Sequence, residues 1–152
     1  MHPADIAALV IDAVGRFHPL LVHFPIALVV TALVAEVLYA LRKNQDFGTA
    51  ALFLITAAAW TSVPAFLAGF AAAAGAAFDS DLAGALVVHR FAGVAAPMLA
   101  FIAAGMGHST RRSGQVWEQM VYRAFLGLAA VAVGVAGLYG GRLVHGAGYL
   151  WR

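Results

Sequence analysis

The sequence predicts an all-α integral membrane protein, a four-helix bundle preceded by a short amphipathic helix in the membrane interface. Its 152 residues are 63% hydrophobic and 11% charged, whereas a soluble domain is roughly 45–50% apolar and about 25% charged. Four apolar segments are each long enough to cross a hydrocarbon core of about 30 Å. The polar segments between them are short, so consecutive helices should pack antiparallel in one domain, residues 1–152.

The first 17 residues predict the interfacial helix. Apolar side chains recur at helical spacing from Ile6 to Phe17, and Asp5, Asp12 and Arg16 fall elsewhere on the helical wheel. This pattern is typical of a helix that lies in the plane of the interface. A frayed chain terminus is the alternative. A secretory signal is not expected, because no basic amino-terminal region is present.

The expected membrane spans cover residues 20–41, 48–73, 84–106 and 119–144. Pro19 suits a helix start, because its missing N–H would have no intrahelical partner there. Pro25 leaves the Leu21 carbonyl without its usual donor, which predicts a kink near His23. The segments between the spans, residues 42–47, 75–83 and 107–118, are expected to be loops.

This topology places both termini on one side of the membrane, called here the terminal side, and the first and third loops on the other, the loop side. The loop side carries five basic residues: Arg42, Lys43, Arg111, Arg112 and Arg123. The terminal side carries four: Arg16, Arg90, Arg142 and Arg152. The positive-inside rule then predicts a multi-pass protein of the bacterial inner membrane with both termini in the periplasm.

Four of the six histidines converge on the terminal side. His18 and His23 lie at the start of the first span, His89 near the start of the third, and His145 at the end of the fourth. Ionisable residues inside membrane spans are costly and are usually functional. Neutral imidazole is a common ligand of haem iron, copper and zinc. The histidines are therefore the candidate metal ligands.

Small residues next to two of these histidines favour a flat cofactor, haem b. Gly93 follows His89 by four residues, and Gly141 and Gly137 precede His145 at the same interval. Residues four apart share a helix face, so each histidine should stand above a groove that a macrocycle could enter. A copper or zinc ion needs no groove, and either ion is an alternative, as is a quinone pocket. In a non-catalytic membrane scaffold or assembly subunit, the histidines would be interfacial hydrogen-bonding residues.

Two arginines could pair with haem propionates. Arg90 follows His89, and Arg142 lies three residues before His145. A guanidinium makes a planar, bidentate match to a carboxylate. The alternative is that both side chains extend to lipid headgroups.

The ligand pair is open from sequence alone. The phrases Leu21-Val22-His23 and Val87-Val88-His89 open two helices of the same direction, which suggests two related hairpins with His23 opposite His89. His145 could instead pair with either, and two haems could use all four histidines. His18, just before a helix-starting proline, is expected at the rim.

Other chemistry has little support. Zero cysteines exclude disulfides and thiolate sites, and no basic run indicates nucleic-acid binding. Phosphate loops and hydrolase motifs are absent from the sequence. Glu36 is the one carboxylate within a span, and we expect it to form an ion pair with Arg123 rather than to act as a proton or quinone-site acid.

The segment from His18 to Leu28, which reads His-Pro-Leu-Leu-Val-His-Phe-Pro-Ile-Ala-Leu, resembles the opening of a family of small bacterial four-helix membrane proteins, as does His89-Arg90 in the third span. The family is catalogued as domain of unknown function 2231. Such domains are sometimes joined to Rieske-type or cytochrome c-type modules. The resemblance therefore implies electron transfer at the outer face, with separate membrane or periplasmic redox subunits as partners. We expect a b-type cytochrome subunit with one bis-histidine haem, exchanging electrons with quinone or a partner protein, rather than a stand-alone enzyme.

Overall fold

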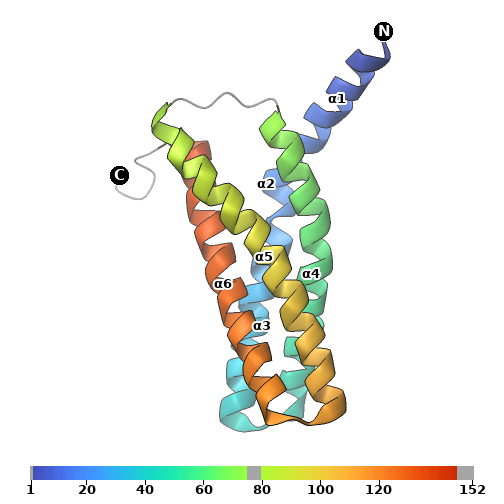
Figure 1. Cartoon of the computed structure of the whole chain (residues 1–152), viewed down its shortest axis with the longest axis vertical. Coiled ribbons are helices and arrows are strands. Elements are labelled where there is room, and N and C mark those ends of the chain that lie inside the picture. Colours follow the sequence, from blue (N-terminus) through green and yellow to red (C-terminus); the bar gives the residue numbers. More distant parts are fainter. Residues whose placement is uncertain (1, 75–79, 147–152) are drawn as a thin grey trace.

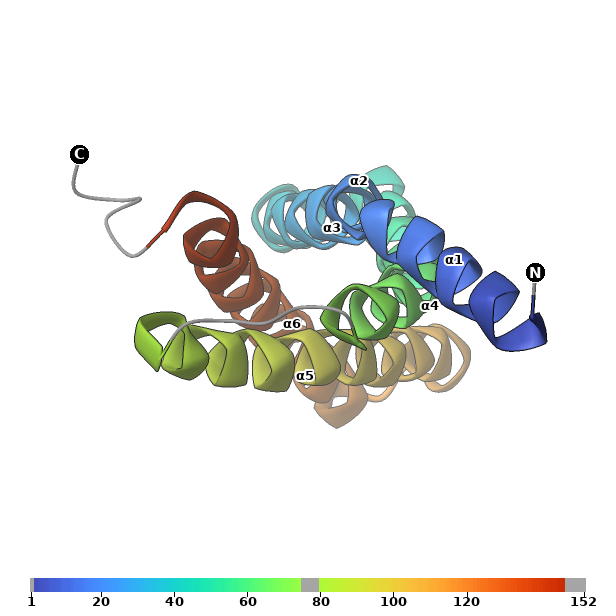
Figure 2. The same ribbon diagram turned by 90° about the horizontal axis from the view of Figure 1, so that it is seen from above.

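The computed structural model of the chain describes residues 2–74 and 80–146, and almost all of them are helical (Figure 1). The elements are α1 (Pro3–Arg16), α2 (His18–Leu21), α3 (His23–Arg42), α4 (Gln45–Ala74), α5 (Ser80–Ser113) and α6 (Val116–His145). The long helices α3 to α6 run up and down beside one another, and α1 leans away from them at the end where the chain begins (Figures 1 and 2).

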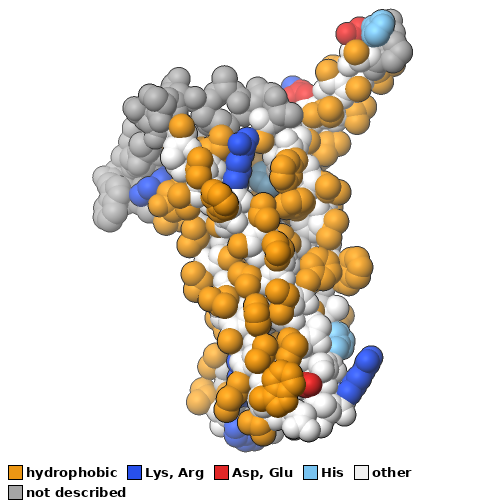
Figure 3. Space-filling model, in the orientation of Figure 1, with side chains coloured by type: hydrophobic (Ala, Val, Ile, Leu, Met, Phe, Trp, Pro, Cys, Tyr) orange, Lys and Arg blue, Asp and Glu red, His pale blue; other side chains and the backbone are white. Residues whose placement is uncertain are grey.

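The prediction of an all-α protein with four membrane spans is confirmed. Four helical stretches of the described residues are long and apolar enough to cross a membrane: Ala4–Arg42, Gln45–Ala73, Leu82–Ser113 and Val116–His145. A helix satisfies its own backbone hydrogen bonds, which lipid cannot do for it. Apolar side chains cover much of the visible face, and many of the charged ones lie near its two ends (Figure 3).

The prediction of a separate, short interfacial helix is wrong, because the first helical stretch is long, with 39 residues from Ala4 to Arg42. Phe17 and Val22 interrupt it, but both keep right-handed helical backbone angles. The Leu21 N–H donates to the Phe17 carbonyl at 2.9 Å, so the helical path continues past Pro19. The interruption at Val22 lies beside the position where Pro25 predicts a kink.

The predicted loop at residues 107–118 is also wrong, since α5 continues to Ser113 and only two residues separate it from α6. Gly114 ends the helix with φ +68°, a left-handed conformation that glycine adopts without steric cost. Arg111 and Arg112 in the last turn favour continuation, because cations stabilise a helix carboxyl end. The first loop is equally short, Lys43 and Asn44. In the predicted loop at residues 75–83, α5 already begins at Ser80, and residues 75–79 lie outside the described part.

The core is built mainly from alanine. Fully buried positions include Ala32, Ala58, Ala103 and Ala129, with the larger Ile55 and Leu126 between them. Lipid gives helices no hydrophobic reason to associate, so membrane bundles rely on small residues that let the backbones approach closely. The α3–α4 and α5–α6 hairpins repeat one pattern. The difference in residue number between His18 and His89 also separates the core residues of the first hairpin from those of the second. It relates Ala32 to Ala103, Ala58 to Ala129 and Ile55 to Leu126.

The predicted ion pair between Glu36 and Arg123 is confirmed. The Arg123 Nε–H donates to Glu36 Oε1 at 2.7 Å, and this contact joins α3 to α6 near the loop side. The Glu36 side chain is buried, and a buried carboxylate needs such a partner.

The core predicts a large effect of Leu126→Ala. The substitution leaves a cavity at a fully buried position, which typically costs about 2–5 kcal/mol. Reversible unfolding in mixed detergent micelles would measure the loss. Leu128→Ala is the matched control on the same helix, because Leu128 is 52% exposed on the outer surface and its truncation should stay within about 0.5 kcal/mol. Equal losses in the two variants would contradict this placement of the core.

Candidate functional site

The terminal-side half of the bundle contains a cavity of about 670 Å³. Cofactor and ligand sites commonly enclose about 300–1,000 Å³ and are mostly apolar. Eight of the nine predicted site residues line this cavity: His18, His23, His89, His145, Arg90, Gly93, Gly137 and Gly141. All four histidines that the predicted topology puts at this end line the cavity, although they come from four different helices.

His18 is held from the α4 side. Its ring nitrogen Nδ1 lies 2.8 Å from the carbonyl oxygen of Ala65, and its ring rests over Gly69. A Cβ atom at Gly69 would lie 2.8 Å from His18 Cε1, closer than real contacts allow. Glycine is therefore required under this ring at its present position.

His89 is held in the same way from α6. Its Nδ1 lies 2.9 Å from the carbonyl oxygen of Ala136, and a Cβ atom at Gly140 would lie 3.1 Å from His89 Cε1. The histidine and its carbonyl partner are 47 residues apart in both cases. Each half of the chain therefore supplies the same unit of imidazole, backbone carbonyl and glycine, from α2 and α4 in the first half and from α5 and α6 in the second.

These hydrogen bonds determine the tautomer of both imidazoles. A carbonyl oxygen can only accept, so Nδ1 carries the proton in each neutral ring and donates it. The lone pair then remains on Nε2, across the ring from the carbonyl. This arrangement is the one that metal-binding histidines use, because the second hydrogen bond orients the ring and raises its basicity.

The separation of the two rings suits one atom ligated by both. The centroids of the His18 and His89 rings are 6.1 Å apart, and the ring planes are 83° from parallel. Two metal–nitrogen bonds of about 2.0–2.1 Å, with about 1 Å from each nitrogen to its ring centre, give a separation of about 6 Å. The separation of the ring centres is therefore the one expected for two imidazoles that bind one metal.

The structure pairs the His18 ring with the His89 ring, whereas the sequence repeat predicted His23 opposite His89. His23 is exposed, and its Nδ1 lies 2.5 Å from the Pro19 carbonyl oxygen of its own helical stretch. The predicted alignment rested on a three-residue phrase. The repeat in the structure is set by the carbonyls and glycines of α4 and α6, far from that phrase, and it aligns His18 with His89. His145 is exposed near the end of α6, where it lines the same cavity.

The predicted glycines and arginines have different surroundings. A Cβ atom at Gly93 or Gly137 would meet no atom within 4 Å, so these glycines widen the cavity rather than seat a neighbouring helix. Arg90 lines the cavity, as does Arg16, which the sequence argument did not select. Arg142 is not part of the lining, and its guanidinium lies 5.1 Å from the Tyr139 ring centroid.

Gly69 and Gly140, which lie against the two rings, were not predicted from the sequence. The signal in the sequence was that each glycine follows its histidine by the same number of residues. This equality is apparent only when His18 is aligned with His89. Within residues 2–74 and 80–146, three or more metal-binding side chains do not gather at any one point.

The family of the chain follows from a comparison with protein-family models. The model of the family described as predicted membrane protein (DUF2231) matches residues 16–149, which include both hairpins and all four histidines of the cavity. No curated protein and no solved structure matches the chain. With this match over most of its length, and with four apolar helices in its structure, the chain belongs to the DUF2231 family of predicted membrane proteins.

Proposed function

We propose that this protein is a membrane b-type cytochrome subunit, in which His18 and His89 are the two axial ligands of one haem b. The observation that carries the proposal is the paired arrangement of the two rings. Each is fixed through Nδ1 to a carbonyl, keeps its Nε2 lone pair, and lies 6.1 Å from the other at a cavity of about 670 Å³.

The lining of the cavity supports a large flat ligand. Alanine, valine and glycine dominate it, and the open space above Gly93 and Gly137 leaves room for a ring system between the helices. Arg90 and Arg16 are the cavity-lining cations that would pair with carboxylate substituents of the ligand. Held by two imidazoles, a haem would transfer electrons and would not activate oxygen.

The alternatives receive less support from the same residues. Zinc prefers four ligands at a structural site and three plus water at a catalytic one, and the described residues offer a close pair. A copper ion would likewise find only this close pair of ligands among the described residues. A quinol could donate its hydroxyl protons to the two Nε2 atoms, but it would leave much of the lining unexplained. A scaffold subunit would need neither the fixed tautomers of His18 and His89 nor the glycines that lie against their rings, Gly69 and Gly140.

The orientation follows from the distribution of basic residues. Arg42, Lys43, Arg111 and Arg112 cluster at the loop-side ends of α3 and α5. With Arg123 on α6, the loop side has five basic residues against four on the terminal side. This excess supports a loop side in the cytoplasm of a bacterial cell and a cavity near the periplasmic face of the inner membrane. The electron partner would then be a periplasmic or membrane redox protein, or the quinone pool.

The absorbance spectrum of the protein purified from haem-replete cells tests the cofactor. We expect a Soret band and an α-band that sharpens on reduction, because two imidazoles give a low-spin iron. His18→Ala and His89→Ala should each abolish this spectrum. His23→Ala and His108→Ala should retain it, since neither ring belongs to the pair. A colourless wild-type protein that yields no haem on extraction would refute the proposal and leave the scaffold function.

Gly69 and Gly140, the glycines that lie against the two rings, give a second test of the ligand pair. Gly69→Ala and Gly140→Ala each force a methyl group against one ligand ring, so we expect about 10–100-fold weaker haem binding, the usual cost of disturbing the support of a metal ligand. Titration of the apoprotein with haem would measure it. Gly134→Ala is the control, because a Cβ atom there meets no atom within 4 Å. Unchanged affinity in both seat variants would argue against this ligand pair.

The orientation can be tested by cysteine labelling, since the chain has no cysteine of its own. In spheroplasts, a membrane-impermeant maleimide should label Ala4→Cys but should label Lys43→Cys only after lysis. The reverse pattern would place the cavity at the cytoplasmic face, and the expected partners would change accordingly.

A further inference from the structure

The two walls of the large cavity are related by the repeat but are lined differently. Two residues separated by the same interval as His18 and His89 are repeat partners. Three such pairs line the cavity: Val22 and Gly93, Phe66 and Gly137, and Phe70 and Gly141. In every pair the first half of the chain supplies a bulky side chain and the second half supplies glycine. The cavity therefore lacks the twofold symmetry of the units that hold His18 and His89.

The first half of the chain lines its wall with aromatic rings. Phe66 and Phe70 lie one turn apart on α4, their ring centroids are 4.9 Å apart, and the ring planes are 63° from parallel. Aromatic rings favour such an edge-to-face arrangement, so each phenyl ring holds the other in place along the cavity. At the equivalent positions of α6, Gly137 and Gly141 carry no side chain.

The second half of the chain leaves its wall open. A Cβ atom at Gly93 or at Gly137 would meet no atom within 4 Å, so no neighbouring helix among the described residues needs the room that these glycines provide. Glycine inside a helix is destabilising by roughly 0.5–1 kcal/mol relative to alanine. A ligand that lies against the bare backbone would give both glycines a reason.

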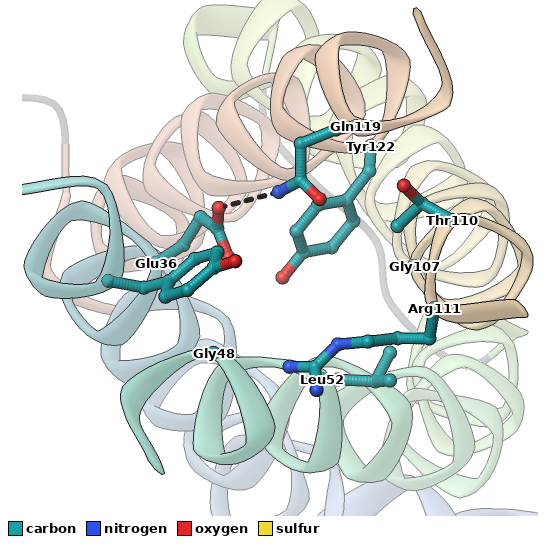
Figure 4. A pocket seen from close by; sticks show the side chains of 9 residues that line it. Glu36, Gly48, Leu52, Gly107, Thr110, Arg111, Gln119 and Tyr122 are labelled. Carbon is teal, nitrogen blue, oxygen red and sulfur yellow. Dashed lines mark hydrogen bonds between the residues drawn. The ribbon is translucent and has the colours of Figure 1, made fainter. Parts of the chain in front are cut away.

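The loop-side end of the bundle shows how a glycine of the second half is used. Glu36 has Gly107 as its repeat partner. A Cβ atom at Gly107 would lie 3.2 Å from the Tyr122 ring, and Figure 4 shows this ring extending from α6 between Glu36 and the helix that carries Gly107. The Tyr122 hydroxyl interacts with the Glu36 carboxylate, which also accepts from the Gln119 amide at 2.9 Å. Glycine at this repeat position thus makes room for a ring.

A haem can meet the unequal walls of the large cavity in two ways. Its propionates lie together at one edge, which Arg90 and Arg16 would hold at the terminal side. The imidazoles of His18 and His89 are equivalent under the repeat, so they hold the ring equally well after a half-turn about the axis of the repeat. This half-turn keeps the propionates at the same edge and exchanges both vinyl groups with methyl groups. In a symmetric cavity the two orientations would be equally populated.

We infer that the unequal walls select one of these two orientations, with Gly137 accepting the larger ring substituents and Phe66 excluding them. The inference rests on the proposed function, because it takes haem b as the ligand and His18 and His89 as its axial ligands. A vinyl group is one carbon larger than a methyl group, and a difference of one carbon in an apolar pocket changes affinity by about 10–200-fold. One orientation is therefore favoured by at least about tenfold.

Proton NMR of the ferric wild-type protein in detergent measures both orientations, because the paramagnetic iron shifts the haem methyl groups of each orientation to separate lines. After haem and protein have equilibrated, we expect one dominant set of methyl lines, with a ratio between the sets of about 10:1 or more. Two sets of comparable intensity would show that the walls do not select an orientation, and would overturn the inference. An iron porphyrin whose vinyl and methyl groups are arranged symmetrically is the control, and it should give a single set.

An exchange of two wall residues tests the named positions. Phe66→Gly combined with Gly137→Phe reverses this pair, so the ratio should shift at least about tenfold toward the minor orientation. Phe53→Gly combined with Gly134→Phe is the matched control on the same two helices, and it should leave the ratio unchanged because both residues are exposed and neither lines the cavity. An unchanged ratio after the first exchange, in protein that still binds haem, would overturn the inference. Wild-type protein that binds no haem would instead refute the proposed function, and the inference with it.

Discussion

Close contact between small side chains is the constraint on which this structure depends. In lipid, apolar helices gain nothing by burying apolar surface against one another, so the bundle is held by backbone approach and by the few polar contacts between helices. Alanines at the centre, such as Ala32, Ala58, Ala103 and Ala129, allow that approach. Where a glycine replaces alanine, the same spacing leaves room for a ring, as at Gly69, Gly107 and Gly140. The rings of His18, Tyr122 and His89 each lie against one of these glycines.

Several polar groups of the described spans find a hydrogen-bond partner inside the protein. Hydroxyls bond within their own helix, as when Thr31 donates to the Ala27 carbonyl and Thr61 to the Ala57 carbonyl. The imidazoles of His18 and His89 instead donate to carbonyls of a neighbouring helix. A hydrogen bond from Nδ1 to the backbone of a neighbouring helix fixes the position of each ring and leaves Nε2 available to a ligand. A histidine that only fills space in the core would not need this hydrogen bond.

Composition and length were enough to predict the four spans, because an apolar segment of that length has few other stable forms. They could not predict the helical ends. The polar residues from His108 to Ser113 look like a loop, yet they continue α5, since polar side chains outside the lipid cost a helix little and glycine comes only at 114. The meeting of the four histidines followed from topology alone. Their pairing did not, because it depends on Ala65 and Ala136 carbonyls that carry no sequence signal of their own.

The repeat of imidazole, carbonyl and glycine has a thermodynamic consequence. One ring belongs to each half of the chain, so a ligand bound by both would cross-link halves whose other contacts are mainly small residues and the ion pair of Glu36 with Arg123. Binding to the folded form alone stabilises it by mass action, in proportion to the logarithm of the free ligand concentration. The quantity of folded protein in the membrane would then follow the supply of its ligand, because chains without it would unfold and be degraded more often.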